Sequence, residues 1–155
     1  MFIAKNIEQY NDNYIHYCEP IKNNIMYEGS FNRILYSTPY FSLNGVYLHI
    51  KLNCSLNDFL SNKNKCYYDI KSNIAVINEI KKIEINILEK FSNSAKTPQY
   101  KLLDQLMSGS IKLPSKNNGI NHFILKISGI WETNNFYGLT YKFMKTDTLT
   151  VRNIQ

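Results

Sequence analysis

Hydrophobic and polar residues alternate most regularly in residues 121–144, NHFILKISGIWETNNFYGLTYKFM. In the first half, Phe123, Leu125 and Ile127 share one side of an extended chain and Lys126 lies on the other. The second half alternates in the same way from Tyr137 to Phe143, and both halves are rich in β-branched and aromatic residues. A period of two in such residues predicts strands. The polar residues 132–135, ETNN, have the length and composition of a hairpin loop. The pattern therefore predicts a β-hairpin with one apolar face and one face that carries lysine.

A second alternating stretch covers residues 46–52, with Val46, Leu48, Ile50 and Leu52 on one side. Its other side carries Tyr47, His49 and Lys51. A strand with one buried face fits this pattern. The central inward residues of the three strands are therefore expected to be buried, namely Leu48, Ile50, Leu125, Ile127, Leu139 and Tyr141.

The period changes to three and four in residues 72–91, where Ile77, Ile80, Ile83 and Ile87 lie on one side of a helix. Residues 82–87 also alternate with a period of two, so a strand in the C-terminal half of this segment remains an alternative. Shorter elements are expected at residues 33–37, 66–70, 100–107 and 111–113. Residues 92–98 look like a linker, and the basic residues 57–65 look like a loop.

The resulting order is three strands, a long helix, minor elements and two strands. It predicts a mainly β or α+β fold, namely a single antiparallel sheet forming an OB-fold-like, partly open barrel with one long inserted helix. An α+β sandwich with helices on one side of the sheet would give much the same order. The 155 residues are expected to form one domain, with residues 1–30 as an N-terminal arm or a short edge strand.

The chain carries a formal charge of +6 and 14% aromatic residues, including 12 tyrosines. A positive surplus favours a polyanionic partner. The charge argument is weaker than it looks, because lysine, asparagine and isoleucine are all abundant, as AT-rich codon usage produces, and Arg33 and Arg152 are the only arginines.

Cys18, Cys54 and Cys66 are three cysteines without a CxxC motif, which indicates neither a disulfide framework nor a zinc knuckle. A reducing compartment is expected. The first residues contain no apolar leader region, and no apolar run reaches the length of a membrane span. We therefore expect a soluble protein that is not secreted and makes no membrane contact.

The sequence contains no recognisable catalytic motif, so we expect a protein that is not an enzyme. His16, His49 and His122 are far apart in the sequence, and none has a second ligand at helical spacing. No metal site and no cofactor are indicated.

Aromatic and basic residues on the expected outward faces are the candidate chemistry. Bases stack on aromatic rings and lysines neutralise phosphates, so this combination suits single-stranded nucleic acid. The candidate binding residues are Tyr47, His49, Lys51, Lys126, Trp131 and Lys142. Two alternatives stay open: the face is an ordinary solvated surface, and Trp131, which has the parity of Phe123, is a core or rim residue instead of an exposed stacking platform.

The segments ILKISGIWET, YGLTYKF and LYSTPYFSLNGVYLHIKL resemble small proteins of nucleocytoplasmic large DNA viruses. The final strand is similar to that of their OB-fold single-stranded DNA-binding proteins, which are related to the phage type. The resemblance implies a protein that coats exposed strands during viral DNA replication, recombination or repair, with DNA preferred over RNA, in the host cytoplasm or nucleus. Residues 148–155, TLTVRNIQ, lack the acidic tail that phage-type proteins use to recruit partners.

A structural protein of the virion is the competing interpretation. Tyrosine is enriched in protein interfaces as well as in base-stacking surfaces. In this interpretation the tyrosine-rich faces pack against other subunits, and a homo-oligomer is possible under either hypothesis.

Overall fold

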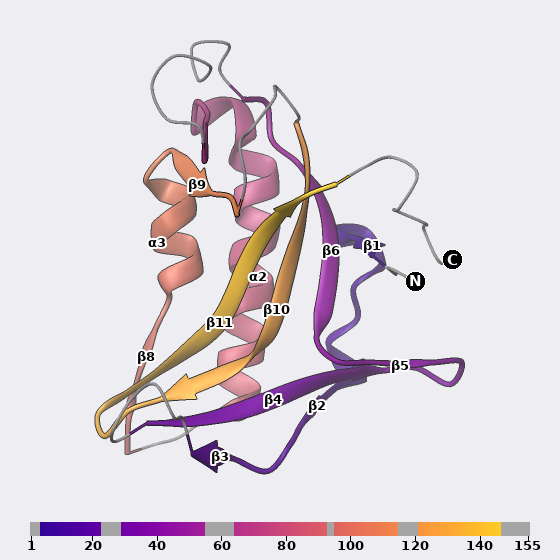
Figure 1. Ribbon diagram of the computed structural model, residues 1–155, viewed down its shortest axis with the longest axis vertical. Helices are drawn as coiled ribbons and strands as arrows, with labels where there is room; N and C mark the ends of the chain where they lie inside the picture. The colour runs from indigo at the N-terminus through magenta and orange to yellow at the C-terminus, as the bar shows by residue number, and fades with distance from the viewer. Residues whose placement is uncertain (1–3, 23–28, 55–63, 93–94, 115–120, 147–155) are drawn as a thin grey trace.

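The computed structural model describes residues 4–22, 29–54, 64–92, 95–114 and 121–146, and it consists of a large sheet with helices on one face (Figure 1). The strands of this sheet are β1 (Lys5–Asn6), β2 (Ile15–Tyr17), β3 (Ile21–Lys22), β4 (Ser30–Ser37), β5 (Ser42–Leu43), β6 (Val46–Lys51), β8 (Thr97–Gln99), β10 (His122–Glu132) and β11 (Phe136–Lys145). The helices are α2 (Ile74–Phe91) and α3 (Lys101–Met107), with short 3-10 turns η1 (Ile7–Gln9), η2 (Asp12–Tyr14) and η3 (Lys71–Asn73). The expected class, mainly β or α+β with one long helix, is confirmed.

β10 is the central strand of the sheet. It pairs with β11 over almost its whole length, as the predicted hairpin requires. On its other side it pairs first with β6, from His122 to Ile127, and then with β4, from Gly129 to Glu132. Two strands that are separate in the sequence therefore share one edge of β10.

A β-bulge between Ile127 and Gly129 marks the place where β10 changes partner. Gly45, at the start of β6, lies against this point, because a Cβ on it would come 2.7 Å from the carbonyl oxygen of Ile127. Gly45 also has a φ of +106°, which L side chains rarely adopt, so glycine is required on both counts. The bulge inserts Ser128 as an extra residue and reverses the parity of the residues that follow.

α2 packs its isoleucine stripe onto the inner face of the sheet, as the spacing of three and four residues predicts. Ile77, Ile80, Ile83 and Ile87 are at most 4% exposed. The predicted inward residues Leu48, Ile50, Leu125, Ile127 and Leu139 complete this core at 0 to 2% exposure. Tyr141 is half-buried instead of buried, because its hydroxyl reaches out to Gln105 of α3.

The pairing of the outer strands differs from the antiparallel topology expected from the sequence. β1 pairs with β6 in parallel, and β8 pairs in parallel with the start of β11, so the sheet is mixed and not wholly antiparallel. Residues 97–99, which fall partly in the expected linker, are a strand, and the described part of residues 1–30 contributes short edge strands. Among the described residues, the strand pairing does not close the sheet into a barrel, so the OB-like closure is not observed.

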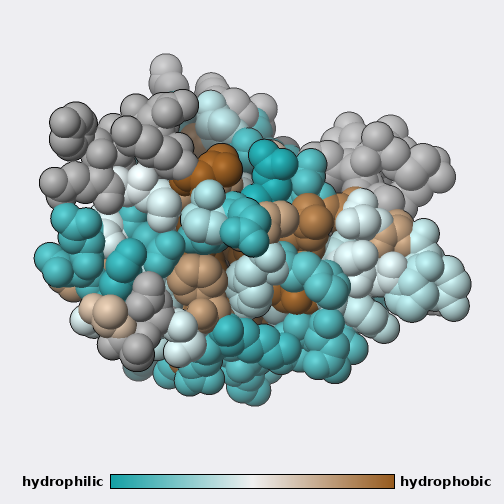
Figure 2. Space-filling model, turned by 90° about the horizontal axis from the view of Figure 1, so that it is seen from below, coloured by the Kyte–Doolittle hydropathy of each residue, from teal (hydrophilic) through white to brown (hydrophobic). Residues whose placement is uncertain are grey.

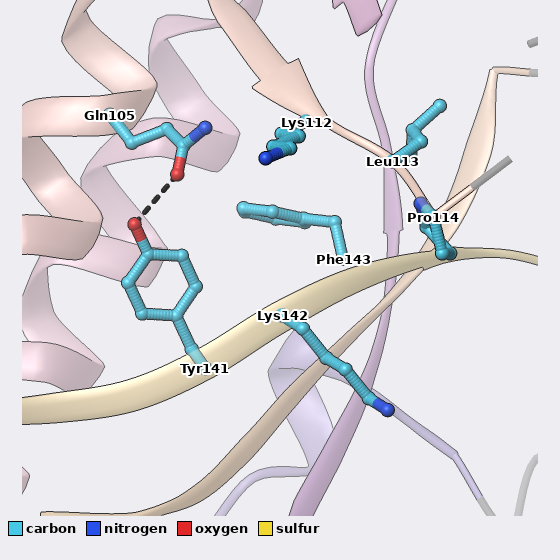
Figure 3. A pocket seen from close by; sticks show the side chains of 7 residues that line it. All are labelled: Gln105, Lys112, Leu113, Pro114, Tyr141, Lys142 and Phe143. Atoms are coloured by element: carbon cyan, nitrogen blue, oxygen red, sulfur yellow. Dashed lines mark hydrogen bonds between the residues drawn. The ribbon is translucent and has the colours of Figure 1, made fainter. Parts of the chain in front are cut away.

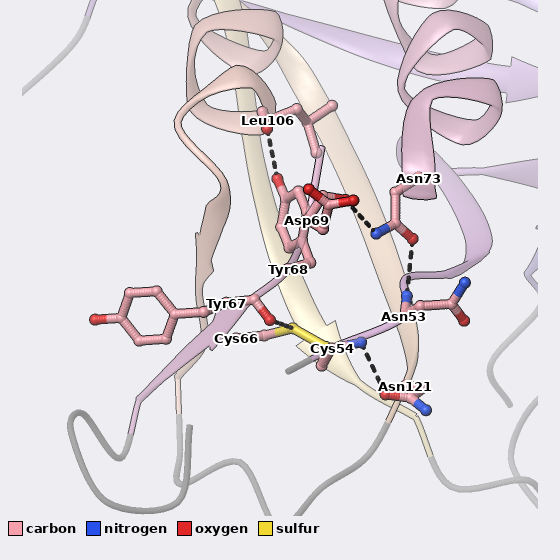
Figure 4. Close-up of a disulfide and its surroundings, with 9 residues drawn as sticks. All are labelled: Asn53, Cys54, Cys66, Tyr67, Tyr68, Asp69, Asn73, Leu106 and Asn121. Carbon is pink, nitrogen blue, oxygen red and sulfur yellow. Dashed lines mark hydrogen bonds between the residues drawn. A yellow bond between two sulfur atoms is a disulfide. The ribbon is translucent and has the colours of Figure 1, made fainter. Parts of the chain in front are cut away.

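A second, two-stranded sheet joins β7 (Lys65–Tyr67) to β9 (Ser110–Lys112). A disulfide between Cys54 and Cys66 ties this sheet to the end of β6 (Figure 4). The expectation that the cysteines form no disulfide is therefore wrong. An odd cysteine count without a motif says little, because the two residues are brought together by the pairing of β7 with β9 and by the end of β6, which no local spacing reveals.

Hydrogen bonds from asparagine side chains hold the same corner together (Figure 4). Asn73, at the start of α2, is 3% exposed, and its Oδ1 accepts the backbone N–H of Asn53 at 2.8 Å. Tyr68 donates its hydroxyl to the carbonyl oxygen of Leu106 at 2.7 Å.

The loop expected at residues 57–65 and the tail at residues 148–155 lie largely or wholly outside the described residues.

Candidate nucleic-acid interface

The face of β6, β10 and β11 opposite α2 carries most of the candidate residues, and we call it the outer face (Figure 1). Its members follow from the strand register, since paired residues of neighbouring strands point to the same side. One cross-strand row contains Tyr47, Lys126 and Lys142, the next contains His49, Ile124 and Met144, and the last contains Lys51 and His122. The structure thus brings Tyr47, His49, Lys51, Lys126 and Lys142 together on adjacent strands.

Within the first row, Lys126 lies over the ring of Tyr47. The ammonium nitrogen is 5.4 Å from the ring centroid, which is within the range of a cation–π contact. Lys126 is half-buried, whereas Lys142 on the neighbouring strand is exposed. A base that stacks on Tyr47 would therefore have to share or displace the side chain of Lys126.

Lys126 and Lys142 are direct cross-strand partners. Like charges placed opposite each other in a sheet destabilise it. The outward positions of β4, β6, β10 and β11 carry no Asp or Glu that would compensate them. The row is therefore a place where positive charge accumulates with no carboxylate at the outward positions of these four strands.

Glu132, the carboxylate at the end of β10, points to the inner side and is 8% exposed. It accepts hydrogen bonds from Asn32 Nδ2 at 2.9 Å and from Ser30 Oγ at 3.1 Å. Lys96 lies 3.3 Å from its other oxygen. Through these contacts Glu132 binds β4 and Lys96, and its charge stays away from the outer face.

Trp131 lies on the outer face with the other candidate residues, although it has the parity of the inward residue Phe123. The bulge at Ser128 shifts the alternation by one residue, so Ile130 points inward and is fully buried. Trp131 is half-buried, and its ring lies over Gly138 of β11, where a Cβ would come 2.7 Å from the indole. Glycine at position 138 is what allows the ring to lie flat on the sheet.

Phe31 and Arg33 of β4 extend the outer face beyond the bulge, and the sequence analysis missed both. Arg33 pairs with Gly129 and is exposed. Phe31 pairs with Trp131, and its ring lies over Gly129, where a Cβ would come 2.7 Å from the ring. The alternation of Asn32, Ile34 and Tyr36 with residues 31, 33 and 35 was the available signal, but nothing in it shows that β4 adjoins β10.

His49 and His122 form a direct contact on the outer face, although they are 73 residues apart in the sequence. His49 Nε2 and His122 Nδ1 are 3.0 Å apart, and the two ring planes differ by 6°. Burial lowers the pKa of His49, and the neighbouring His122 lowers it further. Neutral imidazole is thus favoured at His49 in the free protein.

A small groove lies at the edge of β11, between this strand, α3 and β9 (Figure 3). Its volume is about 320 Å³. Tyr141 donates its hydroxyl to Gln105 Oε1 at 2.7 Å, and burial raises the pKa of this tyrosine to about 12. The side chain of Lys142 points away from the Phe143 ring in Figure 3. Since Phe143 and Leu113 are each 2% exposed, the groove offers little accessible apolar surface.

Nothing among the described residues resembles a metal centre, since no group of three or more His, Cys, Asp or Glu side chains converges there. In the same part of the chain, every helix is too short or too polar to cross a membrane. Comparisons of the chain with models of protein families, with curated proteins and with solved structures found no match. The geometry of the outer face and the resemblance of the hairpin are therefore the guides to the function of this protein.

Proposed function

We propose that this protein is a non-enzymatic single-stranded DNA-binding protein that binds the strand on its outer face. The observation that carries the proposal is the cross-strand row of Tyr47, Lys126 and Lys142, with His49 and Lys51 in the next rows. The resemblance of the hairpin adds the setting, which is the coating of exposed strands during viral DNA replication, recombination or repair.

The chemistry of the row supports a phosphate-bearing partner. Two lysines placed directly opposite each other repel, and a polyanion bound across them would remove this repulsion. Aromatic rings on the same face supply stacking surfaces that accept any base. Neither Phe31 nor Trp131 presents a pattern of hydrogen-bond donors that would read a base edge, so we expect little sequence preference.

The first test compares labelled single-stranded DNA, duplex DNA and RNA of the same sequence by fluorescence anisotropy over a range of salt concentrations. Single-stranded DNA should bind most tightly. If about four phosphates are neutralised, the slope of log K against log salt should be near −3. A folded protein that binds no single strand at low salt would overturn the proposal.

Variants of the row separate stacking from charge. Tyr47→Ala should weaken binding by about 1 to 3 kcal/mol whatever the base composition. Lys51→Ala and Lys142→Ala should each reduce the salt slope by about 0.7, the contribution of one phosphate contact. Lys126→Ala should reduce the slope equally but lose less affinity, because it also uncovers the ring of Tyr47.

Lys81→Ala is the matched control for these variants. Lys81 is exposed on α2, which lies behind the sheet, and its removal changes the net charge by the same amount. The control should keep the salt slope of the parent. If Lys81→Ala lowers the slope as much as Lys142→Ala does, binding follows net charge and not the outer face.

The second candidate is a structural or interaction protein of a virion, and exposed apolar side chains favour it. Tyr40, at the turn between β4 and β5, is 92% exposed. Figure 2 shows hydrophobic patches among hydrophilic groups at the lower end of the molecule, where β3 carries Ile21 at 55% exposure and β11 begins with Phe136 at 39%. Absent strand binding together with concentration-dependent self-association in light scattering would favour this candidate.

A further inference from the structure

The two histidines of the outer face meet edge to edge and share one hydrogen bond. The ring centroids are 5.0 Å apart while His49 Nε2 and His122 Nδ1 are 3.0 Å apart. Face-to-face stacking would bring the centroids closer than this, so the nearly parallel rings lie side by side. One N–H of the pair must point into the space between the rings, and the other nitrogen must accept it.

The number of protons on the pair determines which hydrogen bonds it can form. In the neutral pair, two of the four ring nitrogens carry a proton. One of these protons lies in the hydrogen bond between the rings, so one of the two outer nitrogens carries no proton and is bare. A third proton converts the bare nitrogen into a donor and leaves the shared bond intact. The pair then presents His49 Nδ1 and His122 Nε2 as two N–H donors with one positive charge. A fourth proton would break the shared bond, and is therefore strongly disfavoured.

The neighbours of the pair are mainly cationic. Lys51 is the cross-strand partner of His122, and Asn6 of β1 is the partner of His49. The apolar Ile124, at 2% exposure, lies beside His49 in the same row. The charged groups on the elements that adjoin the pair are Lys5 of β1, Glu8 of η1, Lys51 of β6, Lys126 and Glu132 of β10, and Lys142 and Lys145 of β11. Lys51, Lys126 and Lys142 lie on the outer face, whereas Lys5 and Lys145 pair with the inward residues Leu48 and Phe123.

Of the two carboxylates among these groups, Glu8 is exposed, whereas Glu132 points to the inner side at the far end of β10. Burial opposes the protonation of His49 in the free protein, the neighbouring His122 lowers its pKa further, and the outer-face lysines add like charge. A bound anion would reverse this balance, because it supplies the opposite charge that the site lacks.

We propose that His49, His122 and Lys51 form a phosphate-binding centre that takes up one proton when a phosphate group binds. The proposal rests on the proposed function in that the phosphate belongs to the bound strand, and it adds His122 to the interface. Because burial favours the neutral form of His49 in the free protein, strand binding is coupled to proton uptake and strengthens as the pH falls.

Proton uptake on binding predicts the direction in which the affinity changes with pH. The affinity for a single-stranded oligonucleotide should be about tenfold higher at about pH 5.5 than at about pH 7.5, which is the effect of a one-unit change in a pKa on binding. The salt slope should become steeper by about 0.7 at the lower pH, because the protonated pair acts as one more cation. Lysine side chains stay charged across this range, so they contribute no change of their own.

Variants of the three histidines provide the matched control. His49→Gln and His122→Gln should each abolish most of the gain in affinity at low pH. His16→Gln should keep it, because His16 is exposed on β2 and pairs across the sheet with Leu35 of β4. A pH dependence that all three variants retain would overturn the proposal, while binding itself would still support the proposed function.

The titration of the histidines, followed by NMR, tests the centre without an oligonucleotide. In the free protein the His49 ring signals should change in a step that lies below the ordinary range of histidine, and the ring signals of its hydrogen-bond partner His122 are followed in the same spectra. Adding inorganic phosphate should shift this step to higher pH in the parent but not in Lys51→Ala. If phosphate leaves both signals unchanged, no phosphate centre exists, whatever the protein binds elsewhere. If the protein binds phosphate but no oligonucleotide, the phosphate centre is supported and the proposed function is overturned.

Discussion

Glu84 shows how much a single residue can contribute without any sign in the sequence pattern. It lies on α2 among the buried isoleucines and is 1% exposed. Its two carboxylate oxygens accept the backbone N–H groups of Leu102 and Leu103 at 3.0 and 2.9 Å. The first turn of α3 thus obtains its missing hydrogen-bond acceptors from another helix.

Replacing Glu84 by Ala should therefore lower the free energy of unfolding by about 2 to 4 kcal/mol, since two N–H groups lose their partner in a buried place. Glu89→Ala, on the exposed side of the same helix, should stay within about 0.5 kcal/mol of the parent. Urea denaturation of both variants measures the difference. Equal effects at the two positions would show that α3 does not depend on Glu84.

The pKa of Glu84 adds a pH dependence with a definite sign. Burial raises this pKa above its ordinary value, and the hydrogen bonds from Leu103 and Leu102 oppose the rise only in part. The folded protein therefore holds the proton to a higher pH than the unfolded chain does, and this contribution to stability is lost as the pH rises through the folded pKa. The cost of Glu84→Ala should accordingly be larger near about pH 4 than near about pH 7.

At the scale of elements, regular periodicity was a reliable guide and interruptions of it were not. The hairpin of β10 and β11, the strand β6 and the helix α2 each bury a face, so their sequences alternate with the corresponding period. The strand β8 contains Pro98, and only its pairing with β11 shows that these residues form a strand. The side chains of Trp131, Phe31 and Arg33 could not be placed from the sequence, because their orientation depends on the bulge at Ser128 and on the partner change of β10.

The disulfide joins elements that otherwise make few direct contacts. It closes a loop with a sequence separation of 12 between the end of β6 and β7. Loop-closure entropy predicts a contribution of about 3 kcal/mol for a loop of this size. The same bond holds the outer-face strand β6 next to the corner formed by Asn53 and Asn73.

Cys54→Ser combined with Cys66→Ser should therefore lower the free energy of unfolding by about 2 to 4 kcal/mol. Cys18→Ser, which removes the free cysteine, is the control and should have a smaller effect. Thiol titration of the denatured parent should find one reactive thiol before reduction and three after it, as expected for one disulfide among the three cysteines. Three thiols before reduction would mean that the bond does not form under the conditions of purification.

At the scale of the whole molecule, the sheet and the helices share one core, and the two faces of the sheet have separate roles. The inner face is apolar and covered by α2, while the outer face concentrates lysine, histidine and aromatic side chains. The sequence predicts this division because a period of two assigns every second residue to each face. It does not predict the open, mixed topology, since the parallel edge strands β1 and β8 are two and three residues long and carry no periodic signal.

The central place of β10 has a consequence for the order in which the chain can fold. β4 and β6 pair with a strand that is synthesised much later: Asn32 and Ile130 are 98 residues apart, and His49 and His122 are 73 residues apart. A nascent chain that ends before residue 121 exposes the apolar faces of β4, β6 and α2, so a fragment of residues 1–120 should show little cooperative unfolding by circular dichroism. Contacts this distant also slow folding, and the refolding of the intact chain should take on the order of milliseconds to seconds in stopped-flow fluorescence of Trp131. The complete sheet can therefore form only after the hairpin of β10 and β11 has left the ribosome.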